Sequence, residues 1–257
     1  ICYGVREFGM GCIMNGMAVH GGLIPYAGTF MVFSDYAKHA IRLASLMHLK
    51  VCWVLTHDSY AVGEDGPTHQ PVEQLVMLRS IPGCKVWRPS DSEECAYAWQ
   101  FALKNNGPTC LSLSRQGLPY IEKAENAGVE KGGYIVQDCA GEPEILLMAT
   151  GSEVSLCLEA AAKLAEEGTR VRVISMPCCE VFDEQDAAYR EKVMPKAVRK
   201  RLAVEAAWPE YWRRYVGLDG DVIGLDHFGA SAPGSVLAKE FGFTAENVVA
   251  RAKALLA

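Results

Sequence analysis

The stretch that decides the fold is VCWVLTHDSYAVGEDGPTHQP, residues 51–71. Its first six residues form a continuous apolar run, as expected of a strand that is covered on both faces. The sixteen residues from Thr56 to Pro71 then hold two histidines and three carboxylates. Ligands of parallel α/β sheets bind at the carboxyl ends of strands, so a long polar loop at this place favours function. Spacing alone leaves open a solvated loop whose Gly and Pro residues only shape turns.

On either side of this stretch, short β-rich runs alternate with amphipathic helices. Residues 85–88 and 109–113 are predicted strands, and 6–20 and 35–48 are predicted helices. A capping box at 90–93 opens a helix that runs to about 105. The helix at 6–20 has an apolar stripe of Met10, Ile13, Met14 and Met17, and the helix at 90–105 has one of Cys95, Trp99 and Leu103. The alternation predicts an α/β fold in which helices join parallel strands.

A second αβ series follows the polar, glycine-containing stretch 116–133, which is typical of an interdomain linker. Strands are expected at 144–149, 170–175, 201–205 and 222–224, with helices at 153–167 and 245–256. The first of these helices has an apolar stripe of Val154, Leu158, Ala161, Ala162 and Ala165, Gly168 is its expected C-cap residue, and Thr244 caps the second. Gly151 and Ser152 precede the first helix, and simple capping is favoured there over an anion site. A length of 257 residues fits two domains.

Composition narrows the class of protein. The net charge of −6 argues against a nucleic-acid partner, and no apolar run is long enough to span a membrane. The ten cysteines include no C-x-x-C pair, so we expect free thiols in a reducing, cytoplasmic compartment rather than disulfides or a metal site. Five of them lie in apolar runs and are expected to be buried, namely Cys12, Cys52, Cys95, Cys110 and Cys157.

Two shorter motifs contain further candidate residues. Glu7 belongs to a charged pair in GVREFGM that opens an otherwise apolar helix, and taken alone it is best explained as a first-turn acid that favours the helix dipole. The segment GTFMVFSDY, residues 28–36, holds three aromatic side chains within seven residues. Spacing alone favours core packing for them.

The order and the amino-acid sequences of these segments closely resemble those of bacterial-type transketolase. The matching segments are YGVREFGM, PYAGTFMVFSDYA, THDSYAVGEDGPTHQP, VWRPSD, LSRQGLP, KGGYIVQD, ATGSEVSL and FGASAP. They are spread along the sequence, and the resemblance continues through them to the end of the chain. The resemblance implies two three-layer αβα domains with mostly parallel sheets. The first, residues 1–120, would be a pyrimidine-binding domain that lacks its first strand and helix. A linker at 121–133 and a C-terminal domain at 134–257 would follow.

The implied activity is transfer of a two-carbon ketol unit from a ketose phosphate to an aldose phosphate, a reaction of the pentose phosphate pathway. Its cofactors would be thiamine diphosphate and Mg2+. Glu7 matches the family's catalytic glutamate, which hydrogen-bonds the aminopyrimidine ring of the cofactor. Phe30, Phe33 and Tyr36 match the aromatic residues that pack around that ring.

Four further residues match the family's sugar channel. His57 is similar to the histidine near the sugar phosphate of the acceptor, and Asp65 to the aspartate that reads a sugar hydroxyl. His69 resembles the histidine beside the cofactor amine, which binds substrate and assists proton transfer. Arg115 matches the arginine that grips the sugar phosphate, a task for which a planar guanidinium is suited.

The chain also departs from the family pattern. The upstream diphosphate-binding domain, which holds the metal ligands, is outside this sequence, so we assign no metal ligand here and expect the chain alone to be inactive. The family's active site is shared between two chains of a homodimer, and we expect the same assembly. Tyr60-Ala61 replaces the usual Ile-Gly, and we expect Tyr60 to reach toward the channel.

Several other functions stay open. Dihydroxyacetone synthase, 1-deoxyxylulose 5-phosphate synthase and the beta subunit of a 2-oxoacid dehydrogenase share the glutamate and the two-domain plan. A catalytically silent assembly module is a further alternative, although five matching site residues argue against it. A dinucleotide-dependent oxidoreductase is excluded, because no strand is followed by G-x-G-x-x-G.

Overall fold

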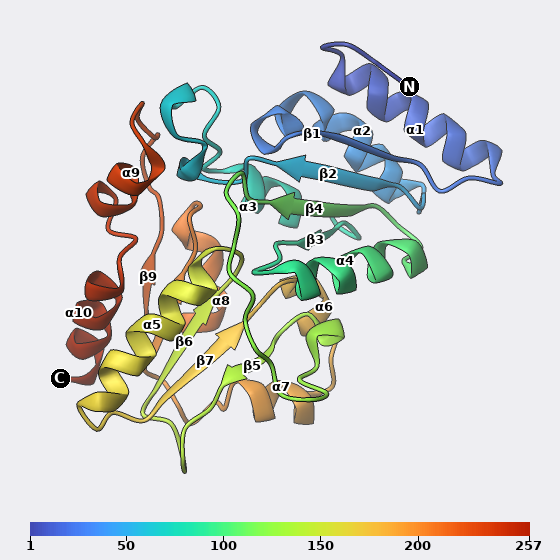
Figure 1. The fold of residues 1–257 in the computed structure, drawn as a ribbon. Coiled ribbons are helices and arrows are strands. Elements are labelled where there is room, and N and C mark those ends of the chain that lie inside the picture. The colour runs from blue at the N-terminus through green and yellow to red at the C-terminus, as the bar shows by residue number, and fades with distance from the viewer.

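The computed structural model describes residues 1–257, which form two sheets with helices on both faces of each (Figure 1). The first sheet is fully parallel, in the order β1-β2-β4-β3, with strands Tyr26–Phe30, Cys52–Thr56, Thr109–Leu113 and Lys85–Trp87. The second has the order β5-β7-β6-β8-β9, with strands Tyr134–Gln137, Val171–Ser175, Ile145–Ala149, Arg201–Val204 and Asp221–Ile223. Only β5 is antiparallel to its neighbour. The predicted fold class is confirmed.

Side chains of the first sheet alternate between two apolar layers, as the pleat of a strand requires. Trp53 and Leu55 pack under helices α1 (Glu7–His20), α2 (Ser34–Leu46) and α3 (Gln74–Arg79). Cys52 and Val54 face α4 (Ser92–Lys104) and the beginning of α6 (Cys179–Asp183). Because both faces are covered, the strands are as continuously apolar as the sequence suggested.

The second sheet is covered in the same way. Leu147 faces α5 (Glu153–Glu166), α9 (Gly234–Glu240) and α10 (Ala245–Leu256), whereas Met148 faces α6, α7 (Ala187–Val193) and α8 (Arg213–Val216). The 3-10 helices are η1 (Met31–Phe33), η2 (Tyr60–Asp65), η3 (Val129–Lys131) and η4 (Pro209–Trp212). Thr244 caps α10 by accepting a hydrogen bond from Asn247 N, as predicted. The C-cap residue of α5 is Glu167, and the predicted Gly168 comes one position later with φ 88°.

Three details of the predicted helices are wrong. Helix α4 is capped by Asp91, not by Ser90. The buried face of this helix is Glu94, Ala98 and Ala102, and the predicted stripe lies one residue further along the chain. In α1 the predicted stripe includes Ile13, which is 48% exposed. In α5, Ala162 and Ala165 are exposed, whereas Cys157, Ala160 and Leu164 are buried. Each misplaced apolar stripe corresponds to a rotation of the buried face of its helix. The direction of that face depends on where the neighbouring sheet lies.

Two strands and several short helices lie outside the predicted elements. β1 has a single buried residue, Ala27, because it is an edge strand, so its apolar pattern is weak. β5 is also an edge strand. All ten cysteines are free, but of the five expected to be buried Cys12 is exposed and Cys95 is half-buried. None of the helices is both long and apolar enough to cross a membrane.

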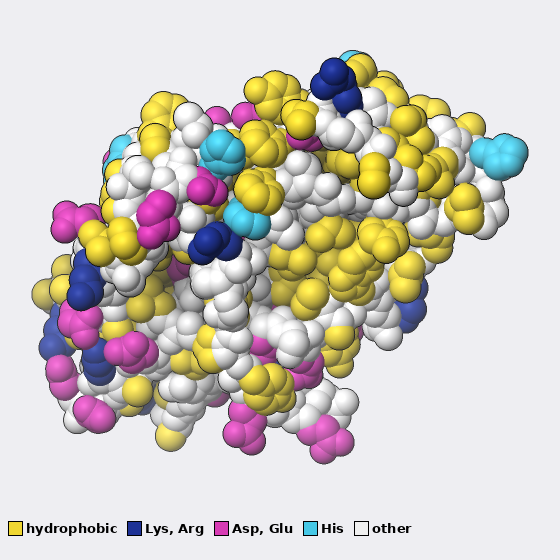
Figure 2. Space-filling view, turned by 45° about the horizontal axis from the view of Figure 1, so that its top comes forward, with side chains coloured by type: hydrophobic (Ala, Val, Ile, Leu, Met, Phe, Trp, Pro, Cys, Tyr) yellow, Lys and Arg dark blue, Asp and Glu magenta, His cyan; other side chains and the backbone are white.

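The surface around α1 and β1 is unusually apolar. Its exposed apolar side chains are Phe8, Ile13, Val19, Leu23, Ile24 and Tyr26. Figure 2 shows hydrophobic side chains gathered over this part of the molecule. A contiguous apolar surface of this kind is typical of an interaction site.

Candidate active site

Strand register brings the predicted site residues to one edge of the first sheet. Phe30 is the last residue of β1 and pairs with Thr56, the last residue of β2, which pairs in turn with Leu113 of β4. His57 follows Thr56 directly, and Arg115 follows Leu113 by two positions. The carboxyl ends of three neighbouring strands therefore deliver these side chains to the same place, where parallel sheets bind their ligands.

Aromatic and imidazole rings form a connected cluster at this edge. The ring centroids of Phe30 and His57 are 3.6 Å apart and nearly parallel. His69 lies edge-on to Phe33 at 5.5 Å and to Phe30 at 6.3 Å. Tyr36 contacts Phe33 at 6.2 Å and is 66% exposed. The cluster is thus half-buried and open on one side.

Charged groups surround His57. Burial and the neighbouring Arg115 lower the pKa of the His57 imidazole below 6.5, while Asp65 and Asp58 act in the opposite direction. These charges are therefore within electrostatic reach of the ring, and the neutral imidazole predominates at neutral pH. Its Nδ1 lies 3.0 Å from Thr56 Oγ1. Figure 2 shows histidine side chains beside acidic and basic ones next to the apolar surface.

Glu7 lies outside this ring cluster. It is the first residue of α1, which covers the sheet and precedes the parallel strand β1. The helix therefore begins near the edge where the strands end, as Figure 1 shows. The Glu7 side chain is half-buried and makes no hydrogen bond or ion pair in this chain. The carboxyl group is therefore free to interact with a ligand.

The polar loop 57–70 is held by the C-terminal domain. Tyr60 is only 8% exposed and stacks on Phe243 at 4.9 Å, with Phe241 edge-on at 5.9 Å. Gln70 Nε2 donates to Gly63 O at 2.8 Å and to Ala230 O at 2.9 Å. The expectation that Tyr60 reaches toward the channel is wrong, because the residue packs into the opposite domain.

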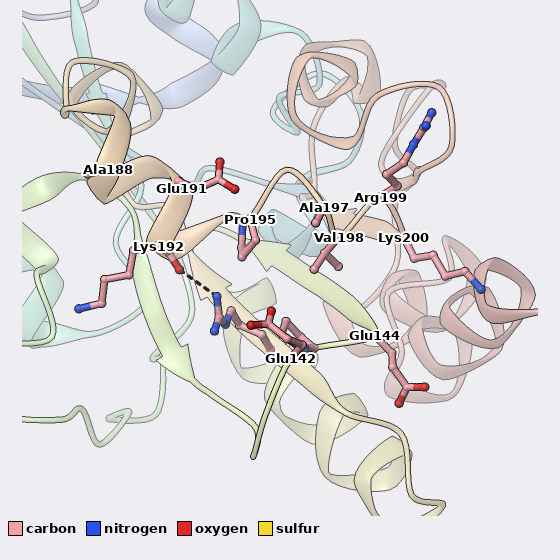
Figure 3. Close-up of a pocket in the computed structure, with 12 residues that line it drawn as sticks. Glu142, Glu144, Ala188, Glu191, Lys192, Pro195, Ala197, Val198, Arg199 and Lys200 are labelled. Carbon is pink, nitrogen blue, oxygen red and sulfur yellow. Dashed lines mark hydrogen bonds between the residues drawn. The ribbon is translucent and has the colours of Figure 1, made fainter.

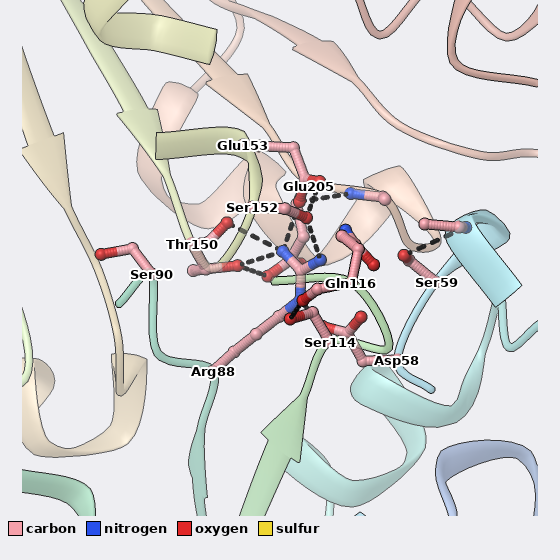
Figure 4. A network of polar contacts seen from close by, with 12 residues as sticks. Asp58, Ser59, Arg88, Ser90, Ser114, Gln116, Thr150, Ser152, Glu153 and Glu205 are labelled. Atoms are coloured by element: carbon pink, nitrogen blue, oxygen red, sulfur yellow. Dashed lines mark hydrogen bonds and ion pairs between the residues drawn. The ribbon is translucent and has the colours of Figure 1, made fainter. Parts of the chain in front are cut away.

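A buried polar network that was not predicted from the sequence lies behind the loop (Figure 4). Arg88 has no exposed surface, and its Nε donates to Asp58 Oδ2 at 2.8 Å. Its Nη1 donates to Thr150 O at 2.8 Å and forms an ion pair with Glu153. A single arginine directly after a buried strand was the only signal in the sequence.

A second buried pair extends this network. Arg79 donates to both carboxylate oxygens of Glu205 at 2.7 and 2.8 Å, and Trp212 Nε1 donates to the same carboxylate at 2.8 Å. Thr150 Oγ1 donates to Glu205 at 2.6 Å and so links the two arginine sites. Each of the two buried arginines is paired with an opposite charge, as burial requires.

The turn at Gly151 and Ser152 lies against the first domain. Ser152 is the N-cap residue of α5, as predicted, but its side chain makes no hydrogen bond to the α5 backbone. The guanidinium of Arg88 lies against Gly151, so that a Cβ there would be 2.8 Å from Arg88 Cζ. The turn receives a cation from the first domain, not an anion.

A hollow of about 890 Å³ lies away from this edge, beside the start of β6 (Figure 3). Arg172 Nη1 donates to Lys192 O at 2.9 Å within it. Acidic and basic side chains alternate around it, and only three of its twelve lining residues are hydrophobic. No group of three or more His, Cys, Asp or Glu side chains in the chain is placed to hold a metal ion.

Comparison with protein families gives two matches that together span most of the chain. The model of the transketolase pyrimidine-binding domain matches residues 1–120, and that of the transketolase-like C-terminal domain matches residues 132–244. Transketolase 1 of Escherichia coli strain K12 is 54% identical over 259 residues, covering 100% of this chain. The chain spans only 39% of the length of that relative.

Solved structures show the same likeness. A transketolase from Leishmania mexicana superposes with a TM-score of 0.94 at 46% identity, covering 98% of this chain and 37% of that one. A Pichia stipitis transketolase in complex with sedoheptulose 7-phosphate has a TM-score of 0.93 at 41% identity, covering 99% and 37%. The chain therefore belongs to the transketolase family and corresponds to its pyrimidine-binding and C-terminal domains.

Proposed function

We propose that the protein containing this chain transfers a two-carbon ketol unit from a ketose phosphate to an aldose phosphate. The strongest support is the cluster of aromatic rings, imidazole rings and charged side chains at one edge of the first sheet. Phe30 stacks on His57, His69 lies beside both Phe30 and Phe33, and Asp65 and Arg115 lie within electrostatic reach of His57. The related Pichia stipitis structure contains a sugar phosphate, which supports this substrate class.

The residues at this edge fit the pyrimidine half of thiamine diphosphate. Phe30 and Phe33 are half-buried, and Tyr36 is exposed, so their rings have open surface for a flat heterocycle. When bound, the cofactor would supply the nucleophilic carbon and the electron sink for cleaving the sugar C–C bond. We propose that its diphosphate and Mg2+ are held by residues outside this chain, without which the chain is inactive.

Glu7 would act on the pyrimidine ring. A carboxyl group at the first turn of α1, free of partners within the chain, is able to hydrogen-bond a ring nitrogen and share a proton with it. Phe30, Phe33 and Tyr36 would exclude water from the ring and fix its orientation.

The polar side chains would bind the sugar. Arg115 supplies a planar cation for a phosphate, and the neutral imidazole of His57 lies beside it to hydrogen-bond the same group. Asp65 would accept a hydrogen bond from a sugar hydroxyl. His69, held by Thr68 Oγ1 at 2.9 Å from its Nδ1, would bind the substrate and move a proton near the cofactor amine.

Membership in the transketolase family also supports proposals about the oligomeric state, the domain boundaries and the cellular compartment. We propose a homodimer with an active site shared between chains, and the exposed apolar surface of α1 and β1 supports an interface there. We propose domains at residues 1–120 and 134–257 with a linker at 121–133, since the last strand of the first sheet ends at Leu113 and the second sheet begins at Tyr134. Cysteines buried in strands, such as Cys52 and Cys110, suit a reducing compartment, and we propose the cytoplasm.

The test is ketol transfer from xylulose 5-phosphate to ribose 5-phosphate by the full-length protein, wild type against Glu7→Gln. Loss of this acid–base partner is expected to lower the rate roughly 10²–10⁴-fold. The control is Glu166→Gln, an exposed residue at the end of α5, which should leave the rate unchanged. Wild-type activity on pyruvate and glyceraldehyde 3-phosphate instead would identify a different thiamine enzyme. Inactivity on both substrate pairs would indicate a silent assembly module.

A further inference from the structure

His57 has an uncommon backbone conformation. Its φ of 62° lies in the left-handed region, which few non-glycine residues adopt. Such a conformation persists only where the surrounding structure holds it in place. The ring of Phe30 stacks on one face of the imidazole. On the backbone, Thr56 before His57 is held in β2, and the remaining restraint comes from the residues that follow.

Asp58 provides that restraint. The residue is 2% exposed, and its Oδ2 accepts a hydrogen bond of 2.8 Å from Arg88 Nε. Its other oxygen, Oδ1, has no partner. Arg88 is therefore the only group that neutralises and hydrogen-bonds this buried carboxylate.

The rest of the Arg88 guanidinium is bound by the other domain. Thr150 accepts from Nη1 through its carbonyl at 2.8 Å and its hydroxyl at 3.0 Å, and Glu153 forms an ion pair with the same nitrogen. Figure 4 shows the guanidinium between Asp58 on one side and the turn of Thr150, Ser152 and Glu153 on the other. The guanidinium group is planar and its donors have fixed directions. The acceptors on one side of it are therefore held in a fixed position relative to those on the other side.

We propose that Arg88 is a positioning residue for His57. Acting through Asp58, it ties the backbone that orients the imidazole to the turn between β6 and α5, so that the C-terminal domain sets the direction in which His57 meets the substrate phosphate. The inference rests on the proposed function, because it assigns His57 to the phosphate of the acceptor. It gives the C-terminal domain a part in substrate recognition.

The test uses the full-length enzyme and the near-isosteric variant Asp58→Asn, which removes the charge that Arg88 holds. The KM for ribose 5-phosphate should rise about 10-fold, because a displaced contact group loses much of its effect. The KM for unphosphorylated ribose and the kcat for either acceptor should change less than about 2-fold. A merely structural role for Asp58 would shift both acceptors alike, and that result would overturn the proposal.

Two further variants sharpen the test. Tyr134→Phe is the matched control, because it removes a buried hydrogen bond of 2.8 Å between the same two domains, to Glu94, without touching the loop. It should leave both KM values unchanged, and a rise equal to that of Asp58→Asn would overturn the proposal. If Asp58→Asn does not fold, Arg88→Lys keeps the cation but loses the fork and should give the same selective rise.

His57→Ala separates failure of this inference from failure of the proposed function. If His57→Ala raises the KM for ribose 5-phosphate and Asp58→Asn does not, Arg88 has no positioning role. If His57→Ala itself has no effect, the assignment of His57 to the phosphate is wrong. The NMR titration of His57 C2–H in Arg88→Lys then decides on positioning alone, because this variant keeps the Asp58 charge that itself acts on the His57 pKa. A changed curve in Arg88→Lys but not in Tyr134→Phe supports positioning, and an unchanged curve refutes it.

Discussion

The phenyl ring of Phe30 lies 3.6 Å from the imidazole of His57, centroid to centroid, with 15° between the ring planes. Strand register explains this contact, because Phe30 pairs with Thr56 and His57 is the next residue. Two segments that are 26 residues apart in the sequence are thus joined where β1 and β2 end. The stack covers one face of the imidazole and contributes to the burial that lowers its pKa.

Replacing the aromatic ring should therefore change the titration of His57. In Phe30→Leu, water gains access to the imidazole, the charged form is better solvated, and the pKa of His57 should rise toward 6.5. NMR titration of the His57 C2–H resonance measures this. Phe8→Leu is the control, since Phe8 contacts a different histidine, His39, at 5.8 Å. An unchanged His57 pKa in Phe30→Leu would show that the ring does not control its solvation.

Much of the fold could be predicted from the sequence, because a strand covered on both faces must be apolar throughout. β2 and β4 have this pattern and were predicted almost to the residue. β1 lacks it, since an edge strand has one open side, and it was missed. The buried face of α4 was misplaced by one residue, because helix periodicity alone does not reveal the direction of the sheet.

The candidate site divides in the same way. The polar loop follows a recognisable strand, which makes it predictable. The structure places His57 and His69 of that loop near Phe30, with Asp65 within electrostatic reach of His57. The roles of these residues remain proposals. Arg88 was not identified, because its partners come from positions 58, 150 and 153, and only the packing of two domains brings them together.

The close approach of Gly151 to Arg88 predicts a large effect from one added methyl group. Gly151 has φ 54°, and its Cβ would lie 2.8 Å from Arg88 Cζ. Gly168 has φ 88° but no heavy atom within 4 Å of its Cβ position. Both alanine variants incur backbone strain of about 1–2 kcal/mol, and only Gly151→Ala adds overpacking of about 1–3 kcal/mol. Urea unfolding of the two variants measures the difference, and equal losses would contradict the predicted clash.

The packing of Tyr60 predicts that this residue matters for stability. Tyr60→Ala removes a ring that stacks on Phe243 and meets Phe241 edge-on, and it should lower the free energy of unfolding by about 3–5 kcal/mol. Tyr36→Ala removes a ring of the same size that is 66% exposed and should lower it by less than about 1 kcal/mol. Thermal or urea unfolding compares the two. A loss in Tyr60→Ala no larger than that in Tyr36→Ala would mean that Tyr60 is not packed as described.

The Arg79–Glu205 pair predicts a specific loss of stability in acid. Burial alone would raise the pKa of Glu205, but the charge and hydrogen bonds of Arg79 lower it from 4.5 to about 2. A carboxylate with a lowered folded-state pKa stabilises the fold fully above its unfolded pKa, near 4.5. That contribution is lost as the pH falls from 4.5 toward 2. At neutral pH it is on the order of 3 kcal/mol.

Glu205→Gln should therefore be less stable than wild type at pH 7, by about 3–5 kcal/mol, because Arg79 is left as an unpaired buried charge. The difference should shrink between pH 5 and pH 3, since only the wild type loses the carboxylate contribution there. Burial raises the pKa values of Glu94 and Glu180, but both carboxyls are present in either protein, so their effects cancel in the difference. Urea unfolding of both proteins across this pH range measures it. Glu246→Gln, which removes an exposed partner of Lys163, is the control and should show little pH dependence relative to wild type. A stability difference for Glu205→Gln that stays constant from pH 7 to pH 3 would show that Arg79 does not lower the pKa of Glu205.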